Sequence, residues 1–479
     1  MVTDIVDTGN DATNGSVVLL HGLAANRVIM TYLARGFALL NLRVFVPDMP
    51  GHGRTPGPFS FARADACANS FVRQLIARGA IDPERTILAG HSMGGALAVR
   101  VAARIPVAGL VAISPAPMVT TYGIQATMLI FDDPPPPPAN TLVLSGSWEP
   151  RSVRDTAHAL VSGNAEATDK YLVIPHATHA SLLLDPKVAR ASQAWAAHVL
   201  NIDSNAALPS RLPIAGSMMG LLGIFLLAGP FLRETLGSNS VESGTTGKAE
   251  TDAKTDQGPT ECAPAINARS ASRMLLEIAA ASSVVVGLLQ AWNPFGVLHV
   301  FEGDYLAGFL LILGVVLLAL HWRGIGGLWQ VKPRPLLAAA FAGIVLPLLI
   351  YSWLDLTISE AWLTSARWLR LPALIALMLP YHTAEELLLG PLQARSNTVR
   401  LGLALCFRLI AWCALLAAIL LMQNGEILLA LLAPYFGVFC LLQRTGMDVV
   451  RKGTGSPLAA ALFGAILLAG FCVVVFPIT

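Results

Sequence analysis

Long apolar runs dominate the second half of the chain and limit what it can fold into. Each is close to the ~20 residues that a helix needs to cross a bilayer. The eight runs cover residues 212–232, 274–292, 305–322, 336–354, 369–390, 399–422, 426–442 and 457–477. Only 13% of all residues are charged, about half the share found in soluble domains. The sequence therefore predicts an all-α transmembrane bundle of about eight helices.

The first 205 residues follow a different pattern. Short runs rich in Val, Ile and Leu alternate with helix-like stretches, and such runs are typical of buried strands. They lie at residues 16–22, 42–48, 86–92, 107–114, 140–146 and 170–176. Repeated alternation of strand and helix predicts an α/β fold whose mostly parallel sheet carries helices on both faces.

These patterns divide the chain into four expected parts. An α/β domain fills residues 1–205, and a first transmembrane helix lies in 206–232. A disordered linker rich in Gly, Ser, Thr and charged residues covers 233–272, and the helical transmembrane domain covers 273–479. The formal net charge is only +2, so we expect no nucleic-acid partner. No pair of cysteines has a zinc-ligand spacing, so we expect no metal site.

The predicted location is a membrane crossed several times, but the side of the α/β domain is open. Most Lys and Arg residues fall in every second loop between the runs. The positive-inside rule then places the first 205 residues outside the cytoplasm. The polar segment 1–15 does not have the pattern of a secretory signal, which favours the cytoplasm. An N-terminal anchor lost through a misplaced start codon would reconcile the two observations.

The segment "ILAGHSMGGALAV" (87–99) points to chemistry. An apolar strand runs into Gly90, Ser92 and Gly94 and continues as a small-residue helix. Glycines on both sides let the backbone turn sharply, so that the serine is exposed above the sheet edge. The start of the following helix directs positive charge toward a developing oxyanion. We interpret Ser92 as a nucleophile; the alternative is a serine that only fills a turn.

Three segments in order, "VVLLHGLAANR" (17–27), "VPDMPGHGRT" (46–55) and "GHSMGG" (90–95), resemble the α/β-hydrolase family. The resemblance covers roughly residues 15–200 and implies an α/β-hydrolase fold. It implies an oxyanion hole formed by the backbone amides of Leu23 and Met93. The segment 115–138 is short for a lid, so the site is either open or partly closed by the membrane domain.

A nucleophilic serine needs a histidine base and a carboxylate that orients it. His179 lies where the family places its base, and His176 and His158 are the competing histidines. Glu149 follows the strand 140–146 and is the best match for the acid. The other candidate acids share only their position between the nucleophile and the base; they are Asp155, Asp132 and Asp133.

Ionisable residues also interrupt one apolar run. His382, Glu385 and Glu386 share one face of a predicted helix, and intramembrane charges are usually paired or functional. An ion pair with Arg408 in the next run is the simplest interpretation. The alternatives are a metal or proton site, an intramembrane hydrolase and placement at the membrane interface.

Together these features predict a membrane-bound serine hydrolase, most simply a carboxylic-ester hydrolase of the esterase or lipase kind. The expected substrate is a small-molecule or lipid ester that shares the bilayer with the protein, and membrane lipids are the expected surroundings. The acyl-enzyme mechanism needs no metal and no cofactor. The alternatives are a transporter or sensor whose α/β domain binds a ligand, and an acyltransferase.

Overall fold

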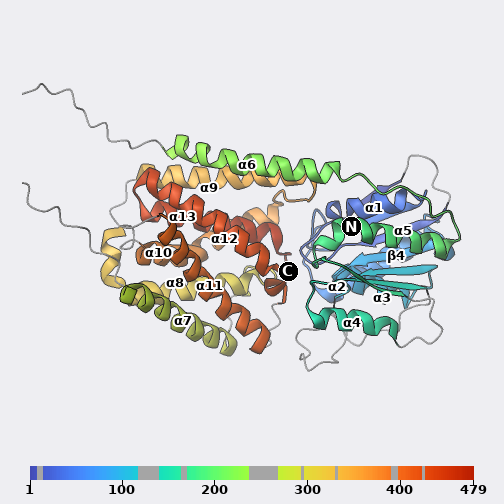
Figure 1. Cartoon of the computed structure of the whole chain (residues 1–479), viewed down its shortest axis with the longest axis horizontal. Coiled ribbons are helices and arrows are strands. Elements are labelled where there is room, and N and C mark those ends of the chain that lie inside the picture. Colours follow the sequence, from blue (N-terminus) through green and yellow to red (C-terminus); the bar gives the residue numbers. More distant parts are fainter. Residues whose placement is uncertain are drawn as a thin grey trace, which may run out of the picture.

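The computed structural model contains a sheet domain, built from β1 to α5, and a helical region, built from α6 to α13 (Figure 1). The structure describes residues 1–7, 14–116, 140–162, 170–236, 268–292, 296–328, 333–389, 397–422 and 427–479. Most of the predicted linker and the candidate acids Asp132 and Asp133 lie outside these ranges.

The sheet has seven strands in the order β1-β3-β2-β4-β5-β6-β7. β1 runs antiparallel to β3, and all other neighbours are parallel. The strands are β1 (Thr3–Val6), β2 (Ser16–Leu20), β3 (Arg43–Pro47), β4 (Thr86–His91), β5 (Gly109–Ile113), β6 (Thr141–Gly146) and β7 (Lys170–Ile174). The six predicted strands are present. β1 was not predicted, because four residues that form an exposed edge carry little periodic signal.

Helices cover both faces of the sheet, as the strand–helix alternation predicts. Alternate residues of β2 point to opposite faces: Val17 and Leu19 belong to one apolar core, and Val18 and Leu20 to the other. The first core is closed by α1 (Thr31–Ala38) and α5 (Pro186–Leu200). The second is closed by α2 (Phe61–Ala77), α3 (Met93–Ala102) and α4 (Arg151–Ser162).

Eight long helices make up the described helical region. They are α6 (Leu212–Leu236), α7 (Ala268–Ala291), α8 (Gly303–Leu320), α9 (Pro333–Thr357), α10 (Ser365–Leu389), α11 (Asn397–Met422), α12 (Ile427–Thr454) and α13 (Pro457–Val475). α13 lies in the middle of the bundle, and α6 lies along its outside against α9.

The prediction of about eight membrane spans is wrong. Within the described ranges, six helices are long and apolar enough to cross a membrane: α6, α7, α8, α9, α11 and α13. The runs 369–390 and 426–442 do form helices, α10 and α12. Both helices also carry several ionisable residues, including Glu385 and Glu386 on α10 and Arg444 on α12, and these charges lower the hydropathy that a span requires.

Candidate active site

Ser92 lies at the turn between β4 and α3, with the strained backbone angles φ 54° and ψ −119°. A positive φ is costly for a residue that has a Cβ, and it persists only where the surroundings hold it. Ser92 N donates to Ile113 O at 2.9 Å, and Ser92 O accepts from the Ala96 and Ala116 amides. The turn is therefore fixed on both sides, with the serine side chain at the carboxyl edge of the sheet.

Three glycines make this turn possible. A Cβ on Gly90 would lie 2.2 Å from Gly94 O, and a Cβ on Gly94 would lie 2.2 Å from Leu20 O. A Cβ on Gly22, at the end of the neighbouring strand, would lie 3.1 Å from the Ser92 Cβ. Only glycine allows β2, β4 and α3 to approach so closely around the serine.

The structure brings Glu149 and His179 together at the same edge. His179 Nδ1 lies 2.6 Å from Glu149 Oε1, and Gly146 N donates to Glu149 Oε2 at 2.5 Å. Ser114 Oγ donates to Glu149 Oε1 and lies 2.9 Å from His179 Nδ1. The carboxylate is buried and the ring is partly exposed, so Glu149 holds the far side of an imidazole whose Nε2 is left for another partner.

Ser92 and His179 both form hydrogen bonds with the end of β5. The Ser92 amide donates to Ile113 O, and the His179 ring contacts the adjacent Ser114 Oγ. In the described ranges no hydrogen bond joins the Ser92 hydroxyl to the His179 ring. In ligand-free enzymes such contacts are often long and tighten only when substrate binds.

His91 supports the loop that carries His179. Its Nε2 donates to the His179 backbone O at 2.9 Å, and the two rings lie 4.7 Å apart. Burial and then the neighbouring His179 lower the pKa of His91 to about 3. His91 is therefore neutral, and its Nδ1 is buried without a partner beside Gly22.

The competing candidates lie apart from this group. His176 is exposed, and its ring packs against Trp148. His158 packs against Tyr171 from α4, and Asp155 on the same helix faces Arg151 at 3.6 Å. Of the candidate bases and acids in the described ranges, His179 and Glu149 are the pair in mutual contact.

The oxyanion hole formed by the amides of Leu23 and Met93 stays a prediction, and both residues are adjacent in sequence to residues of the serine turn. Met93 is the first residue of α3, where backbone amides have no partner within the helix. Leu23 follows Gly22, which lies against Ser92. The Leu23 side chain is partly buried and packs against both the sheet domain and the helical region.

Comparison with known proteins agrees with this architecture. Residues 17–223 match the alpha/beta hydrolase family. This part of the chain is an alpha/beta hydrolase domain. The match ends within α6 and so does not extend to most of the helical region.

The similar proteins each match less than half of the chain. Uncharacterized proteins from two strains of Mycobacterium tuberculosis are 29% identical over 176 residues, which is 34% of this chain. The chain spans 62% of the length of these relatives. A Thermogutta terrifontis esterase is similar in structure to this protein. The match covers 41% of this chain and 93% of the esterase chain, at 20% sequence identity and a TM-score of 0.32. For a Paleococcus ferrophilus monoacylglycerol lipase, the match covers 42% of this chain and 99% of the lipase chain, at 19% sequence identity and a TM-score of 0.32.

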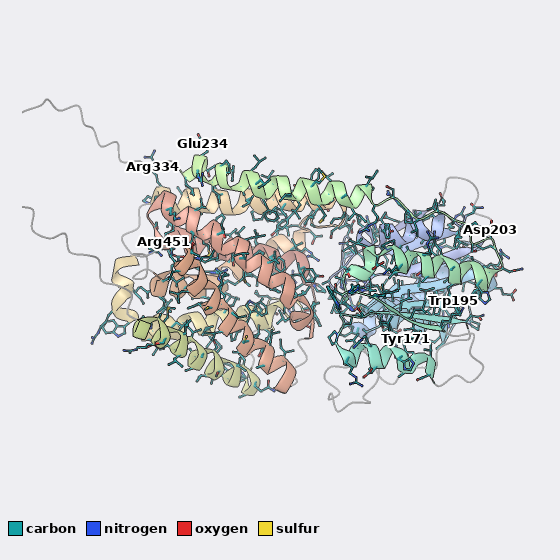
Figure 2. All side chains as sticks on the ribbon, in the orientation of Figure 1. Tyr171, Trp195, Asp203, Glu234, Arg334 and Arg451 are labelled. Carbon is teal, nitrogen blue, oxygen red and sulfur yellow. The ribbon has the colours of Figure 1, made fainter. Side chains whose placement is uncertain are left out.

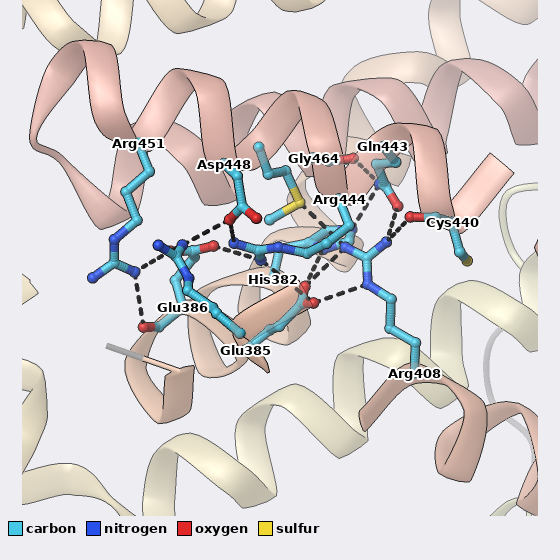
Figure 3. Close-up of polar contacts among 12 residues, drawn as sticks. His382, Glu385, Glu386, Arg408, Cys440, Gln443, Arg444, Asp448, Arg451 and Gly464 are labelled. Atoms are coloured by element: carbon cyan, nitrogen blue, oxygen red, sulfur yellow. Dashed lines mark hydrogen bonds and ion pairs between the residues drawn. The ribbon is translucent and has the colours of Figure 1, made fainter. Parts of the chain in front are cut away.

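A second polar group lies inside the helical region (Figure 3). Arg408 on α11 binds Glu385 with two hydrogen bonds of 2.9 Å, which confirms the predicted pairing. Arg408 also donates to Gln443 Oε1 at 2.8 Å. His382 lies 3.4 Å from Glu385 and from Gln443. This part of the group is therefore an ion pair surrounded by hydrogen bonds from three helices.

Glu386 turns toward a different set of arginines. It meets Arg444 at 2.6 Å and also contacts Arg451. Asp448 lies 2.7 Å from Arg400 and also contacts Arg444. The sequence analysis missed these partners, although Arg444, Asp448 and Arg451 follow one another at spacings of four and three residues on α12, which places them on one helix face.

Sequence reasoning also missed Ser114 and His91. Ser114 directly follows β5, the strand beside β4. A polar residue at the end of the strand next to the nucleophile is a signal that could have identified it, because parallel strands bring their carboxyl ends to one edge. His91 lies one residue before Ser92, but its sequence position does not reveal that its ring turns toward the His179 loop.

Proposed function

We propose that this protein is a membrane-bound serine hydrolase that cleaves carboxylic esters. The observation that carries the proposal is the buried Glu149 on the Nδ1 side of His179, at the sheet edge where Ser92 occupies its strained turn. An acid, an imidazole and a serine in this order are the parts of a nucleophilic triad. The alpha/beta hydrolase family match supports the same assignment.

In this mechanism, Ser92 Oγ attacks the acyl carbon while His179 Nε2 takes its proton. Glu149 accepts the Nδ1–H bond, which fixes the tautomer and stabilises the imidazolium that forms. The amides of Leu23 and Met93 hold the oxyanion, an effect of about 3–4 kcal/mol for one donor in a well-studied case. His179 then protonates the leaving alcohol. Water attacks the acyl-enzyme by the same route, releases the acid and restores Ser92.

The helical region favours lipophilic esters. Its six candidate spans support a protein that crosses the membrane several times. The sheet domain lies at one end of the bundle (Figure 1). The loops after β2 and β3 contact the helical region through residues such as Arg27 and Arg54, so the carboxyl edge of the sheet faces the bundle. An ester dissolved in the bilayer would therefore be close to Ser92.

Labelling by a fluorophosphonate probe tests the proposal. The full chain in detergent is treated with the probe, and the modified peptide is identified by mass spectrometry. We expect a single adduct on Ser92, together with hydrolysis of p-nitrophenyl esters that improves as the acyl chain lengthens. A folded protein that forms no adduct would instead be a ligand-binding transporter or sensor. Esters formed from an added alcohol would identify acyl transfer.

A further inference from the structure

The loop that carries Leu23 is held from outside the alpha/beta hydrolase domain. This loop, residues 22–27, lies between β2 and the short helix that begins at Val28. Asn26 Nδ2 donates to Ser359 Oγ at 3.0 Å, and Arg27 Nη1 lies 2.6 Å from Glu360 Oε1. Ser359 and Glu360 lie in the connection between α9 and α10, so a turn of the helical region grips the loop at two adjacent residues.

The same loop is tied to the sheet domain at one end. Asp48 accepts hydrogen bonds from the Arg27 amide at 2.7 Å and from its guanidinium at 2.5 Å. Asp4 lies 2.8 Å from the Arg27 Nε. Arg27 therefore links the sheet domain to Glu360, and its side chain is only 9% exposed, so water screens these pairs weakly.

A second contact places the chain end beside the neighbouring loop. Phe59 N donates to Ile478 O at 2.6 Å, and Ile478 N donates to Gly51 O at 3.3 Å. The ring of Phe301 meets those of Phe59 and Phe61 edge-on. Figure 1 shows the C-terminus between the two parts of the molecule. The helical region therefore braces both loops that follow β2 and β3.

We propose that Ser359 and Glu360 are positioning residues for the oxyanion hole: they hold loop 22–27 so that the Leu23 amide faces the carbonyl oxygen beside Ser92. This inference rests on the proposed function. It gives the helical region a role in catalysis besides anchoring, because the oxyanion hole forms only while the α9–α10 connection holds loop 22–27 in place.

The energetic reason is that an oxyanion hole works only when its donors are already in place. A donor must lie within about 3 Å of where the oxyanion forms, and loss of one donor costs about 10²–10³-fold in kcat. Leu23 lies three residues from Asn26, so loss of the grip moves its amide rather than the Ser92 or His179 side chains. The change should therefore reduce kcat more than it raises KM.

The test is the double variant Ser359→Ala/Glu360→Ala in the full chain. We expect kcat per active site to fall by about 10²-fold, with a much smaller change in KM, and amide exchange of a peptide covering residues 22–27 to become faster. Active sites are counted by the burst of p-nitrophenol, so an unfolded fraction does not affect the rate. Glu360→Gln, which can still accept from Arg27, should recover most of the rate.

Glu234→Ala is the matched control, because Glu234 is exposed at the far end of α6 (Figure 2). It should match the wild type in rate and exchange. Wild-type kcat per site and wild-type exchange in the folded double variant would overturn the inference and leave the proposed function intact. A wild type that neither labels nor hydrolyses esters would remove the proposed function. Faster amide exchange of residues 22–27 in the double variant would then still show that Ser359 and Glu360 hold this loop in place. Unchanged exchange would show that they do not.

The same contact predicts a pH dependence. Glu360 faces Arg27 and Arg54 as well as the carboxylate of Asp48, and Arg54 also binds Asp355. Burial and then Asp48 raise the pKa of Glu360 from 4.5 to about 7. The folded state therefore holds a proton that the unfolded state releases between these values. The contribution of Glu360 to the free energy of unfolding is fully present below pH 4.5 and is lost as pH rises toward 7.

We expect the melting temperature of the full chain to depend less on pH between about 4.5 and about 7 in Glu360→Gln than in the wild type. The glutamine cannot release a proton, so the part of the stability that falls as pH rises is removed. Thermal unfolding in detergent across this range measures the difference, and Glu234→Gln should retain the wild-type slope. Equal slopes in Glu360→Gln and wild type would contradict the assigned protonation.

Discussion

Ser92→Ala is expected to lower kcat for ester hydrolysis by about 10⁶-fold, and His179→Ala should have nearly the same effect. Each removes one half of the nucleophile–base pair, and the remaining half cannot act alone. The double variant should therefore be no slower than either single variant. Hydrolysis of a p-nitrophenyl ester by purified full-length protein measures all three rates. The variants should still hydrolyse the ester about 10³–10⁴-fold faster than the uncatalysed reaction in water, because the oxyanion hole stays intact.

Two further variants separate the triad from its surroundings. Glu149→Gln should lower kcat by about 10⁴-fold, since an amide no longer selects the required His179 tautomer. His176→Ala should leave kcat unchanged, because its ring packs against Trp148 at the surface. If His176→Ala loses activity and His179→Ala retains it, the base has been assigned to the wrong histidine. Additive losses in the Ser92→Ala/His179→Ala double variant would show that the two do not act as a unit.

Local sequence signals predicted the parts of this molecule that depend on near neighbours. The strand that ends at His91, the turn at Ser92 and the helix from Met93 are adjacent in sequence, so their pattern is visible in a short window. The pairing of Glu385 with Arg408 was also predictable, because Arg408 lies in the middle of an apolar run, 399–422, that contains no acidic residue. β1 was missed, since its four residues gain their conformation only by pairing with β3.

The interface between the two parts could not be read from the sequence. Asp355 lies in the last turn of α9 and Glu360 in the short connection after it, and such charges predict exposure to water and membrane topology. In the structure they face Arg54 and Arg27, some 300 positions earlier in the chain. No periodicity encodes a contact of this range. The sequence analysis left open whether the site is open or partly closed by the membrane domain, and this stays a prediction.

The largest expected loss of stability comes from Arg408→Met. Glu385 would keep only Arg444 at 3.5 Å and His382 at 3.4 Å, and its carboxylate is fully buried. Leaving a buried charge without its main partner costs about 3–5 kcal/mol. Equilibrium unfolding of the full chain in mixed detergent micelles measures this loss.

Removing both charges should be less harmful than removing one. The double variant Arg408→Met/Glu385→Met keeps the net charge of the cluster and leaves no isolated carboxylate, so it should recover much of the lost free energy. Arg273→Met is the matched control: its pair with Glu277 is of the same type, at 2.8 Å, but the arginine is 81% exposed. That change should cost less than about 1 kcal/mol. Equal losses for Arg408→Met and Arg273→Met would mean that water reaches the cluster and that α10, α11 and α12 do not seal it.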